Sequence, residues 1–324
     1  MFILLAIVSC YIWNTLYCKY LEPGGLFFSA CLESTRHWSS ELRKQAAPCY
    51  VFSGGSEVRM GIETRTMHEK HGVRAINAGV QAGNGVRCNA QIALPFLQQG
   101  DTLLISYIPG SDTLVNEGMA HEGINFCHTQ QGFSPFIDGI LPLSHFSIAS
   151  LFTGSATNYA IHIMRLLTRP DCIYRYSSPK NARISDTGRA EVFLTTEQSA
   201  IIKTISCDEN SEVELKGWPS LLKDLRNYCE KKDINLVVYI SRAHIASSEK
   251  KRNAAAALCF MKIGIPVLKD PYLGCWEDSE MFSDTSLHLS IEGGRIFSEF
   301  IALQLKNQQY WNKDELEQII KDSK

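Results

Sequence analysis

The stretch that decides the predicted fold is CYVFSGGSEVRMGI, residues 49–62. Its first four residues form a short apolar run, which is typical of a buried strand. Gly54 and Gly55 then predict a turn, because glycine adopts positive φ and allows other backbone atoms to come close. The mixed polar and apolar residues after Ser56 are typical of a helix start. The pattern therefore predicts Ser56 between a strand and a helix, where backbone N–H groups favour developing negative charge.

A Gly-Gly-Ser turn alone has more ordinary explanations than catalysis. It can simply reverse the chain or cap a helix, and a helix start of this kind can also bind phosphate. Ser56 becomes a candidate nucleophile only if a base and an acid accompany it elsewhere in the sequence.

The composition is that of a globular protein with a sizeable core. The chain has 324 residues, of which 45% are hydrophobic and 20% are charged, and this length allows one large domain or two ordinary ones. The formal net charge is -2 and no long basic run occurs. Binding to nucleic acid therefore lacks an electrostatic basis.

The possible metal ligands form no recognised site. The eleven cysteines include no CxxC pair and no Cys/His cluster at zinc-finger spacing, and buried thiols are their ordinary role. His121, Glu122 and His128 are a loose mixture of metal ligands, but they lack the helical HExxH spacing. We therefore expect no metal site and no cofactor.

The N-terminal segment, residues 1–18, contains no charged side chain. It is long enough to cross a thin bilayer or to serve as a signal anchor, and a buried helix is the alternative. Basic residues such as Lys19 and Arg36 follow the apolar run, so the charge pattern leaves the membrane side open. We expect a membrane anchor over residues 1–18, a connector over residues 19–47 and an extracytoplasmic domain.

The following residues alternate between predicted strands and helices. Strands are expected at residues 49–52, 75–79 and 102–107, and each ends at a turn that contains glycine. Such an alternation predicts parallel strands with right-handed crossovers. The turns then share the carboxyl edge of one sheet, where open α/β folds bind ligands.

The alternation resumes near the C-terminus. Helices are expected at residues 218–232 and 250–262, and strands at residues 235–240 and 266–268. Residues 114–211 show no such alternation of strands and helices. We expect one α/β domain over residues 48–324, in which residues 114–211 form an insertion over the sheet edge.

Asp284 and His288 lie four positions apart, just before the last amphipathic helix. On a loop or a single helical turn, both side chains can point to one face. Acyl transfer by a serine needs a base and a carboxylate that orients it, and the predicted topology places both on the sheet edge that carries Ser56. The alternatives are a helix-capping role for Asp284 and a structural role for His288.

Together these motifs resemble the SGNH/GDSL hydrolase superfamily, and within it bacterial membrane-anchored proteins with a Gly-Gly-Ser first block. The matching blocks are residues 51–62, 76–85, 100–112 and 282–297. The resemblance implies a flavodoxin-like, three-layer α/β/α fold. It also implies Ser56 as nucleophile, His288 as base, Asp284 as the acid that orients the base, and Gly79 as a backbone donor to the oxyanion.

The third and last blocks depart from the family pattern. Asp112 stands where an asparagine usually donates to the oxyanion, and an ionised aspartate has no proton to donate. Either Asp112 is protonated, or Ser111 or Asn84 replaces it as donor, or activity is low. In the last block the family has two residues between its Asp and His, whereas this sequence has three.

The expected function is that of a serine esterase or O-acyltransferase. Its substrate would be a small, acetyl-like acyl ester, such as that of an acetylated cell-envelope glycan. The alternative is a catalytically silent relative that binds a glycan or a partner. The sequence leaves hydrolysis, transfer and oligomeric state open.

Overall fold

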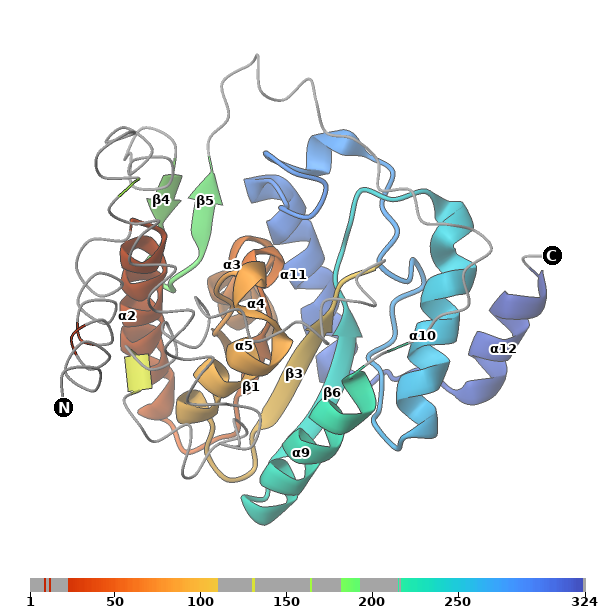
Figure 1. Ribbon diagram of the computed structural model, residues 1–324, viewed down its shortest axis with the longest axis horizontal. Coiled ribbons are helices and arrows are strands. Elements are labelled where there is room, and N and C mark those ends of the chain that lie inside the picture. The colour runs from red at the N-terminus through yellow and green to blue at the C-terminus, as the bar shows by residue number, and fades with distance from the viewer. Residues whose placement is uncertain are drawn as a thin grey trace.

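The computed structural model describes residues 23–109, 182–192 and 217–322, together with Ser9, Ile12, Gln130, Gln131, Met164 and Leu215. Within these residues the chain is an α/β fold around a parallel sheet with the strand order β2-β1-β3-β6 (Figure 1). Its strands are β1 (Tyr50–Ser53), β2 (Ala75–Asn77), β3 (Thr102–Tyr107) and β6 (Asn235–Ile240). Four predicted strands are thereby confirmed. The fifth, at residues 266–268, is present only as isolated bridges, such as Val238 to Val267.

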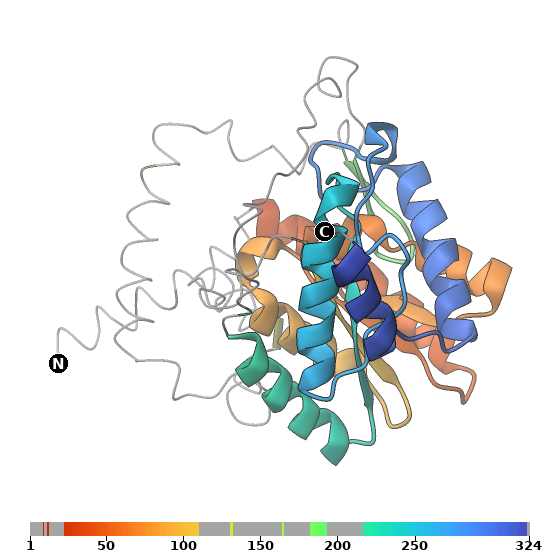
Figure 2. The same ribbon diagram turned by 90° about the vertical axis from the view of Figure 1, so that its right-hand side faces the viewer.

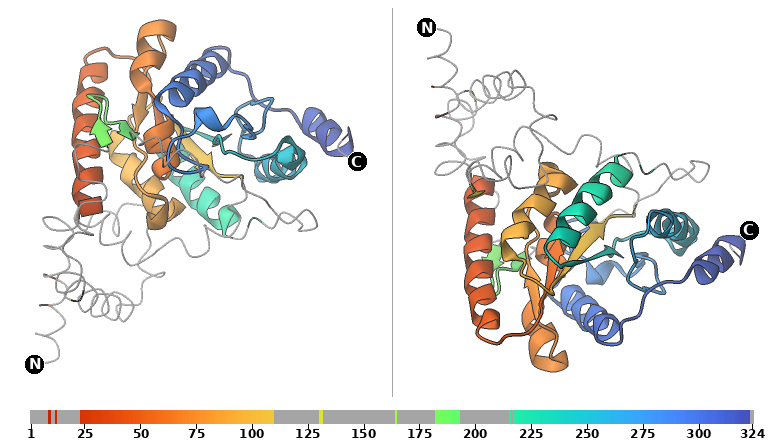
Figure 3. Two further views of the ribbon diagram at one scale, coloured as in Figure 1. Left: turned by 90° about the horizontal axis from the view of Figure 1, so that it is seen from above. Right: turned by 90° about the horizontal axis from the view of Figure 1, so that it is seen from below.

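The side chains of each strand alternate between two buried faces of the sheet. Val51 and Leu103 belong to one core cluster, whereas Phe52 and Leu104 belong to the other. Helices cover both faces, an arrangement compatible with a three-layer α/β/α fold, and Figure 3 shows α9 and α11 on opposite sides of the sheet. The first face carries α5 (Val86–Ala93), α9 (Trp218–Lys231) and α10 (Lys250–Lys262), and the second carries α3 (Ser56–Gly61), α4 (Thr64–His71) and α11 (Ile291–Lys306).

The structure corrects the connector expected at residues 19–47, because residues 23–43 form helix α2 (Pro23–Arg43). Phe28 and Leu32 of this helix are buried in the core, and the indole of Trp38 donates to the Ala75 carbonyl of β2. The helix is therefore part of the domain. No described helix combines the length and the apolar character that a membrane span requires, and residues 1–18 lie outside the described part apart from Ser9 and Ile12.

Two further segments complete the described chain. Of the insertion expected at residues 114–211, the structure describes the antiparallel hairpin of β4 (Ala182–Ile184) and β5 (Ala190–Val192) and a few single residues. The C-terminal helix α12 (Lys313–Asp322) lies against α10, as Figure 2 shows. Its Leu316 is fully buried, so the charged tail is anchored to the core along one side.

Candidate active site

Ser56 is the first residue of α3 and follows β1 after a turn of two glycines. Both glycines are required by close contacts. A Cβ on Gly54 would lie 2.6 Å from Oε1 of Glu57, and a Cβ on Gly55 would lie 2.7 Å from the backbone N of Ala82. The Gly55 N–H donates to Glu57 Oε1 at 2.9 Å. The turn is therefore held by the side chain that follows the candidate nucleophile.

Glu57 lies beneath this turn and is only 5% exposed. Burial is the main cause that raises the pKa of its carboxyl, and this effect outweighs hydrogen bonds that would lower it. The neutral form is thereby favoured. Burial thus disfavours negative charge on the side chain that directly follows Ser56.

The predicted nucleophile, base and acid lie in a hydrogen-bonded chain. His288 Nε2 lies 2.7 Å from Ser56 Oγ, and His288 Nδ1 lies 2.7 Å from Asp284 Oδ1. Burial opposes ionisation of Asp284, but its hydrogen bond and charge interaction with His288 hold the pKa of Asp284 below its ordinary value. An ionised Asp284 then fixes the ring with Nδ1–H toward the carboxylate and Nε2 free to accept from Ser56.

The loop that carries the base and the acid is closed by its own residues. Ser283 donates from its N–H to the His288 carbonyl at 2.7 Å and from its hydroxyl to Asp284 Oδ1 at 3.1 Å. Phe282 and Leu289 pair across the loop as an antiparallel bridge. These contacts fix both side chains of the pair. The helix-capping role considered for Asp284 belongs instead to Ser290, which accepts from the Gly293 N–H.

The structure does not support Gly79 as the backbone donor to the oxyanion. Its N–H donates to Asn77 Oδ1 at 3.0 Å, and a Cβ at this position would lie 2.6 Å from the backbone N of Arg59. Gly79 is therefore explained by the close approach of α3. The N–H groups of Ser56 and Ala82 have no hydrogen-bond partner among the described residues, and Ala82 lies against Gly55.

No sequence pattern points to Ala82, because any residue except proline can supply a backbone N–H. Asn84 lies in the same short helix, η1 (Ala82–Asn84), and is buried, and its side chain makes no hydrogen bond to another described residue. It therefore stays available as a donor. Ser111 and Asp112 lie outside the described residues, as do His121, Glu122 and His128.

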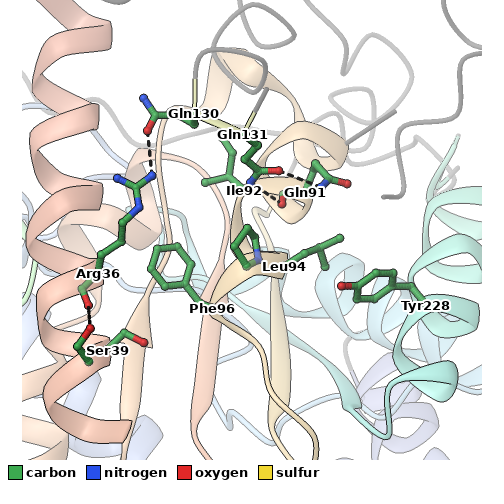
Figure 4. Close-up of a pocket in the computed structure, with 11 residues that line it drawn as sticks. Arg36, Ser39, Gln91, Ile92, Leu94, Phe96, Gln130, Gln131 and Tyr228 are labelled. Atoms are coloured by element: carbon green, nitrogen blue, oxygen red, sulfur yellow. Dashed lines mark hydrogen bonds between the residues drawn. The ribbon is translucent and has the colours of Figure 1, made fainter. Parts of the chain in front are cut away.

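A hollow of about 590 Å³ lies between α2, the α5 segment and α9, and no residue of the Ser56 site lines it (Figure 4). Its polar side chains bind one another. Arg36 donates to Gln130 Oε1 at 3.1 Å, and Gln91 and Gln131 are joined by two hydrogen bonds of 3.0 Å. This hollow is therefore separate from the contacts that join Ser56, His288 and Asp284.

The described residues contain no group of three or more His, Cys, Asp or Glu side chains placed to hold a metal ion. No family model matches the sequence, and no curated protein matches it either. Any function must therefore be argued from the site itself.

Proposed function

We propose that this chain is a serine esterase or O-acyltransferase of the SGNH type, acting on a small acyl ester such as an acetyl ester. The observation that carries the proposal is the chain of contacts from Ser56 through His288 to Asp284, with both hydrogen bonds at 2.7 Å. The strand order supports a flavodoxin-like fold, in which ligands bind where the order reverses, between β1 and β3. Ser56 follows β1 directly.

The proposed reaction begins when Ser56 Oγ attacks the acyl carbonyl carbon and its proton passes to His288 Nε2. The N–H groups of Ser56 and Ala82 stabilise the oxyanion, with Asn84 as a further candidate donor. The C–O bond to the alcohol breaks, the alcohol takes the proton from His288, and the acyl group remains on Ser56. Water or a sugar hydroxyl then attacks the acyl-serine by the same steps, which gives hydrolysis or transfer.

The proposed cellular setting rests on the sequence. Residues 1–18 form an uncharged apolar segment, and we infer that it anchors the protein with the catalytic domain outside the cytoplasm. The substrate class that fits this setting is an acylated glycan of the cell envelope. A membrane-impermeant fluorophosphonate probe tests the location, because it should label intact cells as well as a lysate.

The test of the activity is the Ser56→Ala variant. Wild-type protein should react with a fluorophosphonate probe and hydrolyse an acetyl-ester substrate, and Ser56→Ala should lose both while its thermal unfolding is unchanged. Ser40→Ala is the matched control, since Ser40 is an exposed serine of α2 whose hydroxyl donates to the Arg36 carbonyl of the same helix. Equal labelling of wild type and Ser56→Ala would contradict the proposal. Failure of the wild type to react would favour the silent, ligand-binding alternative.

A further inference from the structure

The hairpin of β4 and β5 is joined by a turn that presses against α2. Gly188 in this turn has a φ of +87°, and a Cβ there would lie 2.1 Å from Thr35 Oγ1 and 2.5 Å from the Cys31 carbonyl oxygen. Only glycine fits that contact. The next residue, Arg189, is only 2% exposed. A residue of the insertion is thus carried into the core of the domain.

Arg189 binds the two elements that carry the proposed catalytic residues. Its Nε donates to the Met60 carbonyl of α3 at 2.9 Å, and its Nη2 donates to the Ser290 carbonyl at 3.1 Å. Met60 lies four residues after Ser56 on the same short helix, and Ser290 lies two residues after His288. One guanidinium therefore spans the gap between the helix of the nucleophile and the loop of the base.

Arg59 makes the reciprocal connection from α3. It is fully buried, and its Nη1 donates to the Gly188 carbonyl at 2.7 Å and to Thr35 Oγ1 at 3.0 Å. Burial lowers the pKa of Arg189, and lowers that of Arg59 to about 10. Neither guanidinium forms an ion pair with a described carboxylate. Burying two cations on neutral carbonyl and hydroxyl groups opposes folding, so general stabilisation is a poor explanation for them.

We propose that Arg189 is a positioning residue, which holds α3 and the loop of residues 283–290 in register so that His288 stays within hydrogen-bond distance of Ser56. The inference rests on the proposed function and extends it to the insertion. Loss of this connection should separate Ser56 from His288. A misplacement of about 1 Å can lower a rate by ~100-fold.

The test compares Arg189→Ala with Arg74→Ala. Arg74 is a matched control because it is also buried and donates to backbone carbonyls, those of Leu42, Gln45 and Ala47, at the start of β2 and away from Ser56. Two quantities are measured on folded protein: the rate of fluorophosphonate labelling, and the downfield proton resonance of His288 Nδ1. Arg189→Ala should lower the labelling rate by about 100-fold and broaden or shift the resonance. Arg74→Ala should lower only the unfolding midpoint.

A second variant serves if Arg189→Ala does not fold. Arg189→Lys keeps the charge, but its single nitrogen cannot reach both sets of carbonyls, so it should show the same changes in smaller degree. An unchanged resonance and labelling rate in either folded variant would overturn the inference. The resonance does not depend on turnover. If wild-type protein fails to react with the probe, the proposed function fails, while the resonance still decides the role of Arg189.

Discussion

Replacing Asn77 with alanine should lower the free energy of unfolding by about 3 to 5 kcal/mol, whereas replacing Asn84 should change it by less than about 1 kcal/mol. The Asn77 amide donates to the carbonyls of Val58 and Ile62 at 2.9 and 2.8 Å and accepts from the Gly79 N–H at 3.0 Å. Each buried group that loses its partner costs about 1–3 kcal/mol, with some relaxation. Asn84 is also buried, but its side chain has no hydrogen-bond partner among the described residues.

Urea denaturation measures the difference directly, because the midpoint and slope give the free energy of unfolding for each variant. The loss for Asn77→Ala is a large fraction of the ~5–15 kcal/mol that stabilises a typical domain. The rate of fluorophosphonate labelling of folded protein should rank the two variants the other way, with Asn84→Ala the more strongly affected. If Asn84 donates to the oxyanion, Asn84→Ala should label ~10² to 10³ times more slowly. Equal stability losses in the two variants would refute the reasoning that the hydrogen bonds of Asn77 stabilise the packing of α3 on β2.

Two further predictions concern the turn and the acid. Gly55→Ala should destabilise the protein by about 1–3 kcal/mol through its clash with Ala82, whereas Gly61→Ala, whose Cβ would lie 3.4 Å from Leu289, should be neutral in the same thermal unfolding assay. Asp284→Asn should lower kcat by ~10⁴-fold. Burial opposes ionisation of Asp284, but His288 holds the pKa of Asp284 below the ordinary 3.8. The ionised Asp284 should therefore stabilise the fold at neutral pH, and this stabilisation should be lost as the pH falls through the lowered pKa. The stabilities of wild type and Asp284→Asn should therefore converge at acid pH. A difference that persists at the lowest pH would contradict this pH dependence.

The strands and the catalytic candidates could be predicted because each left a local pattern. A parallel strand covered on both faces is a continuous apolar run, and residues 102–107 and 235–240 are such runs that end at turns. A parallel topology places Ser56 and His288 on one edge of the sheet. The contact of 2.7 Å between their side chains is compatible with that topology.

Helix α2 was missed because its start resembles a linker. Pro23 and two glycines open it, and such residues usually mark a turn, yet Phe28, Leu32 and Thr35 fall at helical spacing on its buried side. The sequence therefore contains the helical periodicity, but the two glycines at the start of α2 favour a linker. The burial of Arg189 is different, because sequence patterns assign arginine to the surface and only the tertiary contacts reveal its carbonyl partners.

Three residues separate Asp284 from His288, one more than the resemblance to the SGNH/GDSL superfamily implies, and the loop rather than helical periodicity sets the geometry of the pair. The pairing of Phe282 with Leu289 and the bond from the Ser283 N–H to the His288 carbonyl fix both ends of the loop. Three intervening residues therefore still leave 2.7 Å between the carboxylate and the ring, and spacing alone is a weak argument against a catalytic pair at this position.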